Sequence, residues 1–287
     1  MRPIFVLGVP TPQMARVGAM IGCNPDTFGT SDLNLFVEDR LELVWSELNR
    51  LGQAHSDGLL RAVACLYAGD QTMDAVQMAR RWAMRRYFWP VDLVFAELCG
   101  KVAPRRLVDK SRVYGVRRGA IQRIRECIAQ ASFVHLVGHP GFAEATPFAR
   151  QAESPFQEEE FAAGDWVRIN RNICDQLEGL DPAHVHIVRL EDVAADPEAT
   201  LTRLAGALGL RDDAAAIEAM LHPERSPFAA VGPIGAPYGD DRTFLREPAF
   251  RRDMPAVGGG VRLAEGAAAL AERFGYTLEL EPEPSEG

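Results

Sequence analysis

The 287-residue chain has no long uninterrupted hydrophobic run. An apolar stretch follows Met1 and Arg2, but Gly8, Pro10 and Pro12 interrupt it before a secretory core or a membrane span could form. The sequence therefore predicts no signal peptide and no membrane association. Its apolar content of 47% is sufficient for a large buried core, which also excludes a disordered chain.

The sequence also lacks closely spaced cysteine pairs and an excess of positive charge. The five cysteines are dispersed and without CxxC spacing, which predicts neither a disulfide framework nor a metal site and indicates a reduced, cytoplasmic protein. The formal net charge of -9 argues against binding to nucleic acid or to an anionic membrane. Short basic stretches at Arg80-Arg81, Arg85-Arg86 and Arg117-Arg118 are compatible with a cleft for an acidic ligand.

The loop after the first predicted strand lacks the groups that bind phosphate. The apolar run at residues 3–9, followed by small residues at helical spacing, predicts a buried strand that turns sharply into a helix. Phosphate binding at such a turn needs converging N–H groups, small residues and a cation. Residues 11–15 contain no Lys or Arg, Pro12 has no N–H to donate, and Met14 is apolar. Two interpretations stay open here: a ligand-free core element, or a phosphate loop that has lost its ligand groups.

The order of the predicted elements indicates an α/β fold. Buried strands are expected at residues 3–9, 106–108, 133–137 and 185–190, and helices at 33–51, 59–67, 72–84, 165–180 and 196–209. This alternation predicts a central parallel sheet flanked by helices. We expect a single domain over residues 1–278 with a helical section at about 33–100, and a frayed acidic tail at 279–287. The Gly- and Pro-rich segment 226–260 is expected to be a long ordered loop over one face.

Read in order, these elements resemble the bacterial sulfotransferase family that uses 3′-phosphoadenylyl sulfate (PAPS) as donor. The landmarks are residues 3–10, Asn24-Pro25-Asp26 with 31–35, 107–111, 133–140, and 188–192 with 195–197. Residues 222–228, 232–233 and 238–240 are similar to sulfotransferase domains found beside polyketide and peptide synthetases. The resemblance implies a P-loop-NTPase-like sulfotransferase fold with a helical insertion. It also implies a small-molecule or carrier-protein-linked substrate from natural-product biosynthesis.

The same resemblance implies a degenerate PAPS site. The family's phosphate loop corresponds to the segment that holds Thr11 and Gln13, and its 3′-phosphate-binding Arg and Ser correspond to Gly138 and Thr146. Charged hydrogen bonds to phosphate are each worth about 1.5–3 kcal/mol, so the loss of several lowers affinity on the order of 10³-fold or more. No cofactor is therefore expected to bind tightly, and PAPS is the cofactor only if sulfotransferase activity persists. Arg112, where the family has Pro, is a candidate replacement cation.

Four residues are candidates for catalysis. Sulfuryl transfer needs a cation near the bridging oxygen and a base for the acceptor proton, and by position in the family these would be Lys110 and Asp32. His55, before a polar turn, is a second candidate base, and His139 follows a strand at the edge where α/β proteins bind ligands. Each has a structural alternative: a surface ion pair for Lys110, a helix cap for Asp32, and an ordinary loop or turn residue for each histidine.

Three functional hypotheses stay open. The first is an active PAPS-dependent sulfotransferase with a non-standard donor site. The second, which we favour, is a family member recruited to acid–base chemistry on a natural-product or carrier-linked small molecule without PAPS. The third is a non-catalytic pseudo-sulfotransferase that acts as a binding or partner subunit, and a homodimer is also compatible with the sequence. Two measurements distinguish the three hypotheses: whether the protein binds PAPS or PAP, and whether turnover requires Lys110.

Overall fold

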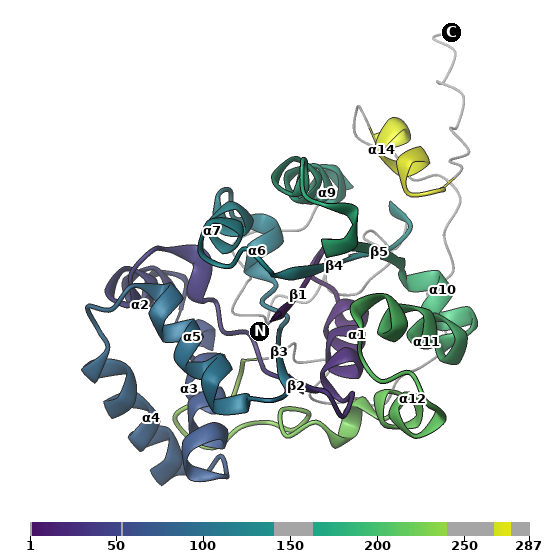
Figure 1. Ribbon diagram of the computed structural model, residues 1–287. Coiled ribbons are helices and arrows are strands. Elements are labelled where there is room, and N and C mark those ends of the chain that lie inside the picture. The colour runs from purple at the N-terminus through teal and green to yellow at the C-terminus, as the bar shows by residue number, and fades with distance from the viewer. Residues whose placement is uncertain (1, 53, 141–162, 240–266, 277–287) are drawn as a thin grey trace, which may run out of the picture.

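The computed structural model describes residues 2–52, 54–140, 163–239 and 267–276. Within these residues, a sheet of five parallel strands forms the centre of the fold (Figure 1). The strands are β1 (Ile4–Gly8), β2 (Thr27–Gly29), β3 (Arg106–Asp109), β4 (Ser132–Val137) and β5 (Val185–Arg189), in the order β2-β3-β1-β4-β5. The predicted α/β fold with a central parallel sheet is confirmed.

The four predicted strands are confirmed with small shifts at their ends, and β2 is the strand that the sequence did not predict. It spans three residues and ends at Gly29, so it is too short for a pattern of apolar residues to identify it. Its position depends on close packing of two glycines. A Cβ added at Gly22 would lie 2.6 Å from the Cα of Gly29, so no larger residue fits where the first helix passes β2.

The central strands are buried on both faces. Every residue of β1 and β4 is buried, and Phe5 pairs in register with Phe133. On one face Phe5 stacks against Phe95 and Phe133, with ring centroids 5.4 and 5.8 Å apart. A strand covered on both faces reads as a continuous apolar run, which explains why the sequence predicted these two strands.

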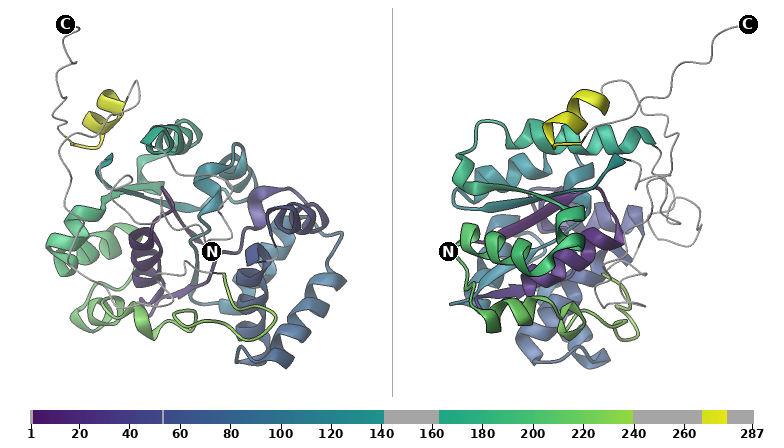
Figure 2. Two further views of the ribbon diagram at one scale, coloured as in Figure 1. Left: turned by 180° about the vertical axis from the view of Figure 1, so that it is seen from behind. Right: turned by 90° about the vertical axis from the view of Figure 1, so that its right-hand side faces the viewer.

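Helices cover both faces of the sheet (Figures 1 and 2). One face carries α1 (Pro12–Gly22), α10 (Leu190–Ala195), α11 (Pro197–Leu208) and α12 (Ala214–Met220), which pack around Val6 and Val134. The other face carries α5 (Val91–Val102), α6 (Val113–Val116), α7 (Ala120–Cys127) and α9 (Ala163–Leu177), which pack around Phe5 and Phe133. Near the C-terminus α14 (Ala267–Arg273) lies against α9.

The predicted helical section contains α2 (Leu41–Leu51), α3 (Ala54–Ala68), α4 (Met73–Arg85) and α5. The predicted helix over 33–51 is wrong at its start, because Asn34 has a left-handed φ of 55° and a 3₁₀ turn, η1 (Leu35–Val37), precedes α2. Tertiary contacts explain the difference. The N–H of Asn34 donates to Oγ of Ser111 over 2.8 Å, and the N–H of Phe36 donates to the hydroxyl of Tyr114 over 3.4 Å. Both N–H groups are thus used outside a helix.

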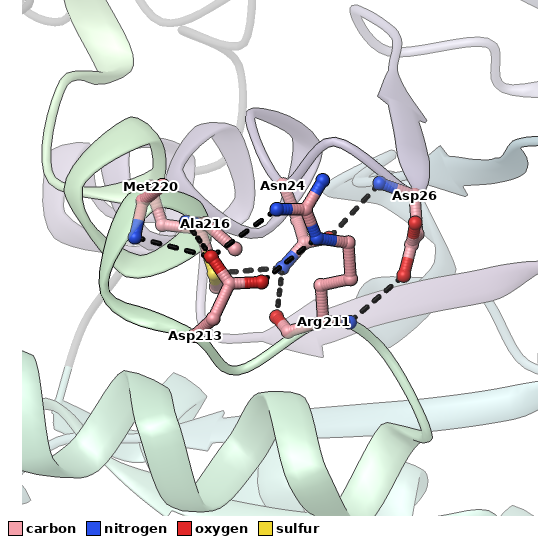
Figure 3. Close-up of polar contacts among 7 residues, drawn as sticks. Asn24, Asp26, Arg211, Asp213, Ala216 and Met220 are labelled. Atoms are coloured by element: carbon pink, nitrogen blue, oxygen red, sulfur yellow. Dashed lines mark hydrogen bonds and ion pairs between the residues drawn. The ribbon is translucent and has the colours of Figure 1, made fainter.

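Polar contacts at the amino edge of the sheet tie the α1–β2 turn to the loop before α12 (Figure 3). Nδ2 of Asn24 donates to the carbonyl oxygen of Arg211 over 2.8 Å, and the N–H of Arg211 donates to Oδ2 of Asp26 over 2.8 Å. Asp213 then caps α12 through the N–H groups of its first turn. Asn24 and Asp26 therefore hold the fold together at the edge opposite the strand ends discussed below.

All five cysteines are free thiols. Burial raises the pKa of Cys23 to about 11 and that of Cys99 to about 12, which makes both poor nucleophiles near neutral pH. Among the described residues, every helix is too short or too polar to cross a bilayer.

Candidate functional site

Buried polar side chains gather where the central strands end. Because β1, β3 and β4 are parallel neighbours, their carboxyl ends meet at one edge, where open α/β sheets bind ligands. Ten polar or charged residues at or beside the β3 end are at most 5% exposed: Ser31, Asp32, Asn34, His55, Ser56, Asp57, Asp109, Lys110, Ser111 and Arg112. We call this group the Asp32 cluster. Burying so many ionisable groups is costly unless they are paired, so the cluster is a candidate site.

Asp32 and Arg112 form a buried ion pair within the cluster. Nε and Nη2 of Arg112 both donate to Oδ2 of Asp32, over 3.0 and 2.6 Å. Oδ1 of Asp32 is buried and has no hydrogen-bond partner among the described residues. Most buried acceptors in proteins are satisfied, so an open carboxylate oxygen is a candidate contact for a ligand. The helix-cap alternative for Asp32 is wrong, because Asn34 precedes η1 and Arg40 precedes α2.

Asp109 is fully buried at the end of β3 and connects that strand to the segment that carries Asp32. Its Oδ1 accepts from the N–H and Oγ–H of Ser111 over 3.0 and 2.5 Å, and its Oδ2 accepts from the hydroxyl of Tyr114 over 2.9 Å. Ser111 in turn accepts from the N–H of Asn34. Burial raises the pKa of Asp109 to about 6, although these hydrogen bonds act in the opposite direction.

Lys110 is buried along α1 and is only 3% exposed, so it does not lie at the surface. Its aliphatic carbons lie over Gly18, where an added Cβ would be 2.9 Å from Cδ of the lysine. The missing side chain at position 18 therefore makes room for Lys110. This contact places the lysine between β3 and the helix that follows β1.

His55 lies in the first turn of α3 and is buried, so its prediction as a residue before a polar turn is wrong. Its carbonyl oxygen accepts from Nδ2 of Asn34 over 3.0 Å. In the same turn, a Cβ added at Gly58 would lie 2.0 Å from the carbonyl oxygen of Asp32, so only glycine fits there. The start of α3 is thus held against the Asp32 segment, which brings His55 into the Asp32 cluster.

In the segment that resembles a phosphate loop, the polar side chain of Thr11 binds a backbone N–H of the same segment. Oγ1 of Thr11 accepts from the N–H of Met14 over 3.1 Å and so caps α1, while Pro12 begins the helix without an N–H. Gln13 is half-buried in the first turn of α1 at the carboxyl end of β1. Thr146, the fourth predicted donor position, lies outside the described residues.

A second polar group lies at the ends of β4 and β5. The carbonyl oxygen of Gly138 accepts from Nε1 of Trp166 over 2.8 Å, and the N–H of His139 donates to Oε1 of Glu191 over 2.6 Å. The hydroxyl of Tyr276 donates to Oε2 of Glu191 over 2.7 Å, and its ring lies edge-on to His139 with centroids 5.4 Å apart. Burial lowers the pKa of His139, and Glu191 acts in the opposite direction. The structure therefore separates His139 from the cluster that contains Asp32, His55 and Lys110.

Residues 226–239 form a segment that runs along α3 and α4, which we call the strap. Arg61 of α3 is 1% exposed and donates to two strap carbonyl oxygens over 2.9 and 2.8 Å. Arg80 of α4 donates to a third over 2.6 Å. At the end of the strap, the carbonyl oxygen of Gly239 accepts from the N–H of Asp32 over 2.8 Å. The predicted ordered loop is confirmed for these residues, and the remainder of 226–260 lies outside the described residues.

Sequence reasoning missed four residues that shape these sites: Asp109, Glu191, Arg61 and Tyr276. Asp109 ends β3 and Glu191 follows β5, so their places at the carboxyl edge were a usable signal. Arg61 donates to two carbonyl oxygens that lie 169 and 177 positions further along the chain. Tyr276 donates to Glu191, which lies 85 positions earlier. No local pattern marks contacts of that kind.

Comparison with known proteins agrees with this architecture. The sequence model of the Sulfotransferase family matches residues 3–214, whereas no curated protein sequence matches the chain. The sulfotransferase domain from the curacin biosynthetic pathway is 20% identical, with a TM-score of 0.79 over 97% of this chain and 99% of that domain. The sulfotransferase domain from the Synechococcus PCC 7002 olefin synthase is 26% identical, with a TM-score of 0.78 over 97% and 96%. Because the family match covers well over half of the sequence and both structures share its fold, this chain belongs to the sulfotransferase family.

Proposed function

We propose that this sulfotransferase-family protein is an enzyme that has lost standard PAPS binding and performs acid–base chemistry on a hydroxyl-bearing natural-product intermediate, either free or carrier-linked. The observation that carries the proposal is Oδ1 of Asp32, a buried carboxylate oxygen without a partner in the described ranges. It lies in a cluster that also holds the buried cations Lys110 and Arg112. The names of the two similar domains, from the curacin pathway and an olefin synthase, support the natural-product class.

The residues at the donor positions do not fit PAPS. Thr11 already uses the N–H of Met14, and Pro12 has no N–H to offer a phosphate. Beside Gly138, where the resemblance places a phosphate-binding cation, the N–H of His139 already donates to the carboxylate of Glu191. A phosphate group at that position would meet the negative charge of Glu191, which opposes its binding, although Arg189 also lies over the neighbouring Tyr276 ring.

In the proposed reaction, Oδ1 of Asp32 accepts the proton of a substrate hydroxyl while Arg112 fixes the carboxylate through Oδ2. The positive charges of Arg112 and Lys110 stabilise the oxyanion that this proton transfer leaves behind. His55 is a second candidate base in the same cluster, and His139 is a candidate at the β4 end.

Calorimetric titration with PAP and PAPS tests the loss of donor binding. We expect no measurable binding at the donor positions at millimolar nucleotide. A sulfotransferase that binds PAP, titrated under the same conditions, is the positive control. Micromolar binding that persists after substitution of arginines outside the donor positions would overturn the proposal.

Mass spectrometry tests the acid–base part. We expect the protein to convert a member of a panel of hydroxyl-bearing pantetheine thioesters without added PAPS, and Asp32→Asn to slow that conversion by about 10²-fold or more. Asp74→Asn, a substitution in the exposed first turn of α4, is the matched control and should leave the rate unchanged. Absence of conversion across the panel would favour a non-catalytic role.

PAPS-dependent sulfuryl transfer is the second candidate function. The burial of Lys110 against α1 favours it, because that helix begins where donor phosphates would be bound in this family. This candidate predicts a sulfated product when PAPS is added, and loss of turnover in Lys110→Ala with the fold intact. Unchanged turnover in that variant would remove Lys110 from the mechanism.

A cytoplasmic location is part of the proposal. It is supported by the five free thiols, which are typical of a reducing compartment. Fractionation of the producing cells tests it, and recovery of the protein from an extracytoplasmic fraction would contradict it.

A further inference from the structure

A cavity lies between α9 and the turn that joins α6 to α7, which are neighbours in Figure 1. Its volume is about 640 Å³. The polar residues that line it are Arg118, Arg168, Arg171, Asn172, Asp175 and Gln176. None of them belongs to the Asp32 cluster or to the polar group around Glu191, so this cavity is separate from both.

Three arginines and one carboxylate line this cavity. Arg168 is paired with Asp165 of the same helix over 2.6 Å. Arg118 and Arg171 are exposed, and neither has a hydrogen bond or ion pair among the described residues. The neighbouring Arg117, by contrast, pairs with Glu47 of α2. Two guanidinium groups without a partner among the described residues therefore line the cavity, one from the turn and one from the helix.

Two amide side chains of α9 bind the turn between α6 and α7. Nδ2 of Asn172 donates to the carbonyl oxygen of Gly115 over 2.7 Å. Oε1 of Gln176 accepts from the N–H groups of Gly119 and Gln122 over 3.1 and 3.2 Å. Gly119 has a φ of 82°, and no atom lies within 4 Å of a Cβ added there, so the space next to Gly119 is open. These hydrogen bonds hold the turn that carries Arg118 against the helix that carries Arg171.

We propose that this cavity binds the phosphate group of a small organic ester, with Arg118 and Arg171 as its main contacts. Guanidinium groups bind phosphate through paired, charge-assisted hydrogen bonds. Pockets of about 300–1,000 Å³ hold small organic ligands, so the volume leaves room for more than the phosphate itself. The net charge of the chain is -9, so these arginines are a local feature and not part of a general basic surface. The inference does not depend on the chemistry proposed at Asp32.

Calorimetric titration with pantetheine 4′-phosphate, PAP and inorganic phosphate tests the proposal and separates the sources of the phosphate. We expect binding that weakens at high salt and that Arg118→Gln and Arg171→Gln each reduce by about tenfold or more. Asp175→Asn should strengthen it, because the substitution removes the carboxylate that lines the cavity. Arg85→Gln is the matched control, since Arg85 is an exposed helical arginine at the end of α4.

The relative affinities identify the ligand. Tighter binding of pantetheine 4′-phosphate than of inorganic phosphate would support an ester with an organic arm. Failure of all three probes to bind at millimolar concentration would overturn the proposal, and so would binding that both arginine substitutions leave unchanged. PAP binding that both substitutions abolish would assign PAP to this cavity and leave the proposed loss of the donor site standing. PAP binding that survives them, while the other two probes respond as expected, would contradict the proposed function alone.

Discussion

Arg112 donates two hydrogen bonds to one oxygen of Asp32, Oδ2, and leaves Oδ1 of the same carboxylate buried without a partner among the described residues. A guanidinium commonly binds both oxygens of a carboxylate in a parallel fork. The observed arrangement fixes the carboxylate and still keeps one acceptor for another molecule. This asymmetry is the physical basis for placing chemistry at Asp32.

Arg112→Met should destabilise the protein strongly, because it leaves the carboxylate of Asp32 buried without its cation. Breaking a buried pair in this way costs about 3–5 kcal/mol in the free energy of unfolding. Asp32→Asn combined with Arg112→Met should recover much of that loss, since no lone charge remains. Urea unfolding of the wild type, both single variants and the double variant measures the coupling. A cost below about 1 kcal/mol for Arg112→Met would mean that water reaches the pair.

Asp109→Asn should remove a pH dependence of stability. The folded pKa of about 6 lies above the ordinary value of 3.8, so the folded state binds a proton more tightly than the unfolded state. The stabilisation is complete below pH 3.8 and is lost as the pH rises through 6, a change of about 3 kcal/mol. Urea unfolding across this range measures it, with Asp74→Asn as an exposed control. An unchanged slope in Asp109→Asn would show that Asp109 titrates normally.

His135 should act in the opposite direction. It is buried in β4 beside Asn170, and burial lowers its pKa to about 4 from 6.5. Its stabilisation is present above pH 6.5 and is lost as the pH falls through 4, again by about 3 kcal/mol. His135→Gln should keep a hydrogen bond to Asn170 and reduce the loss of stability in acid. Unfolding curves of the variant that fall as steeply in acid as those of the wild type would contradict this.

Arg61→Met should release the strap from α3. The substitution removes hydrogen bonds to two strap carbonyl oxygens and a third to Gln71, each worth about 1.5 kcal/mol or more because the donor is charged. Hydrogen exchange at the amides of Gly232 and Asp32 should become faster. Arg50→Met is the control, since the ion pair of Arg50 is with Glu47 in the neighbouring turn of α2, away from the strap. Unchanged exchange at both amides would mean that other contacts hold the strap.

Restoring the donor residues should restore nucleotide binding. Gly138→Arg, combined with a standard phosphate loop in place of residues 11–15, supplies the missing cation and N–H groups. Adding Glu191→Gln removes the carboxylate that accepts from the N–H of His139. We expect micromolar PAP binding by calorimetry only in the combined variant. If that variant is folded and still does not bind PAP, the pocket is closed by other means.

The sequence predicted the elements whose signals are local. β1 and β4 are continuous apolar runs because both of their faces are buried, and Asp196 caps α11 through the N–H of Ala199, as its position before Pro197 predicts. The start of the predicted helix at 33 failed because Ser111 and Tyr114, both more than 70 residues away, bind the N–H groups of that segment.

The candidate site was predictable only in part for the same reason. Family resemblance pointed to Asp32 and Lys110, and both side chains are buried in the structure. The partner of Asp32 is 80 residues away in the sequence, so neither spacing nor composition could identify Arg112 in that role. The carboxylate of Glu191 beside Gly138 likewise depends on how β4 and β5 lie next to each other.

The contacts of the strap limit where this protein can be truncated or fused to another. The family match ends at residue 214, yet the strap and Tyr276 lie beyond it and contact Asp32 and Glu191. A fragment that stops where the sequence similarity stops would therefore lose the backbone partner of Asp32 and the acceptors of Arg61. The smallest piece of the chain worth expressing, or transplanting into another biosynthetic assembly, must extend through residue 276.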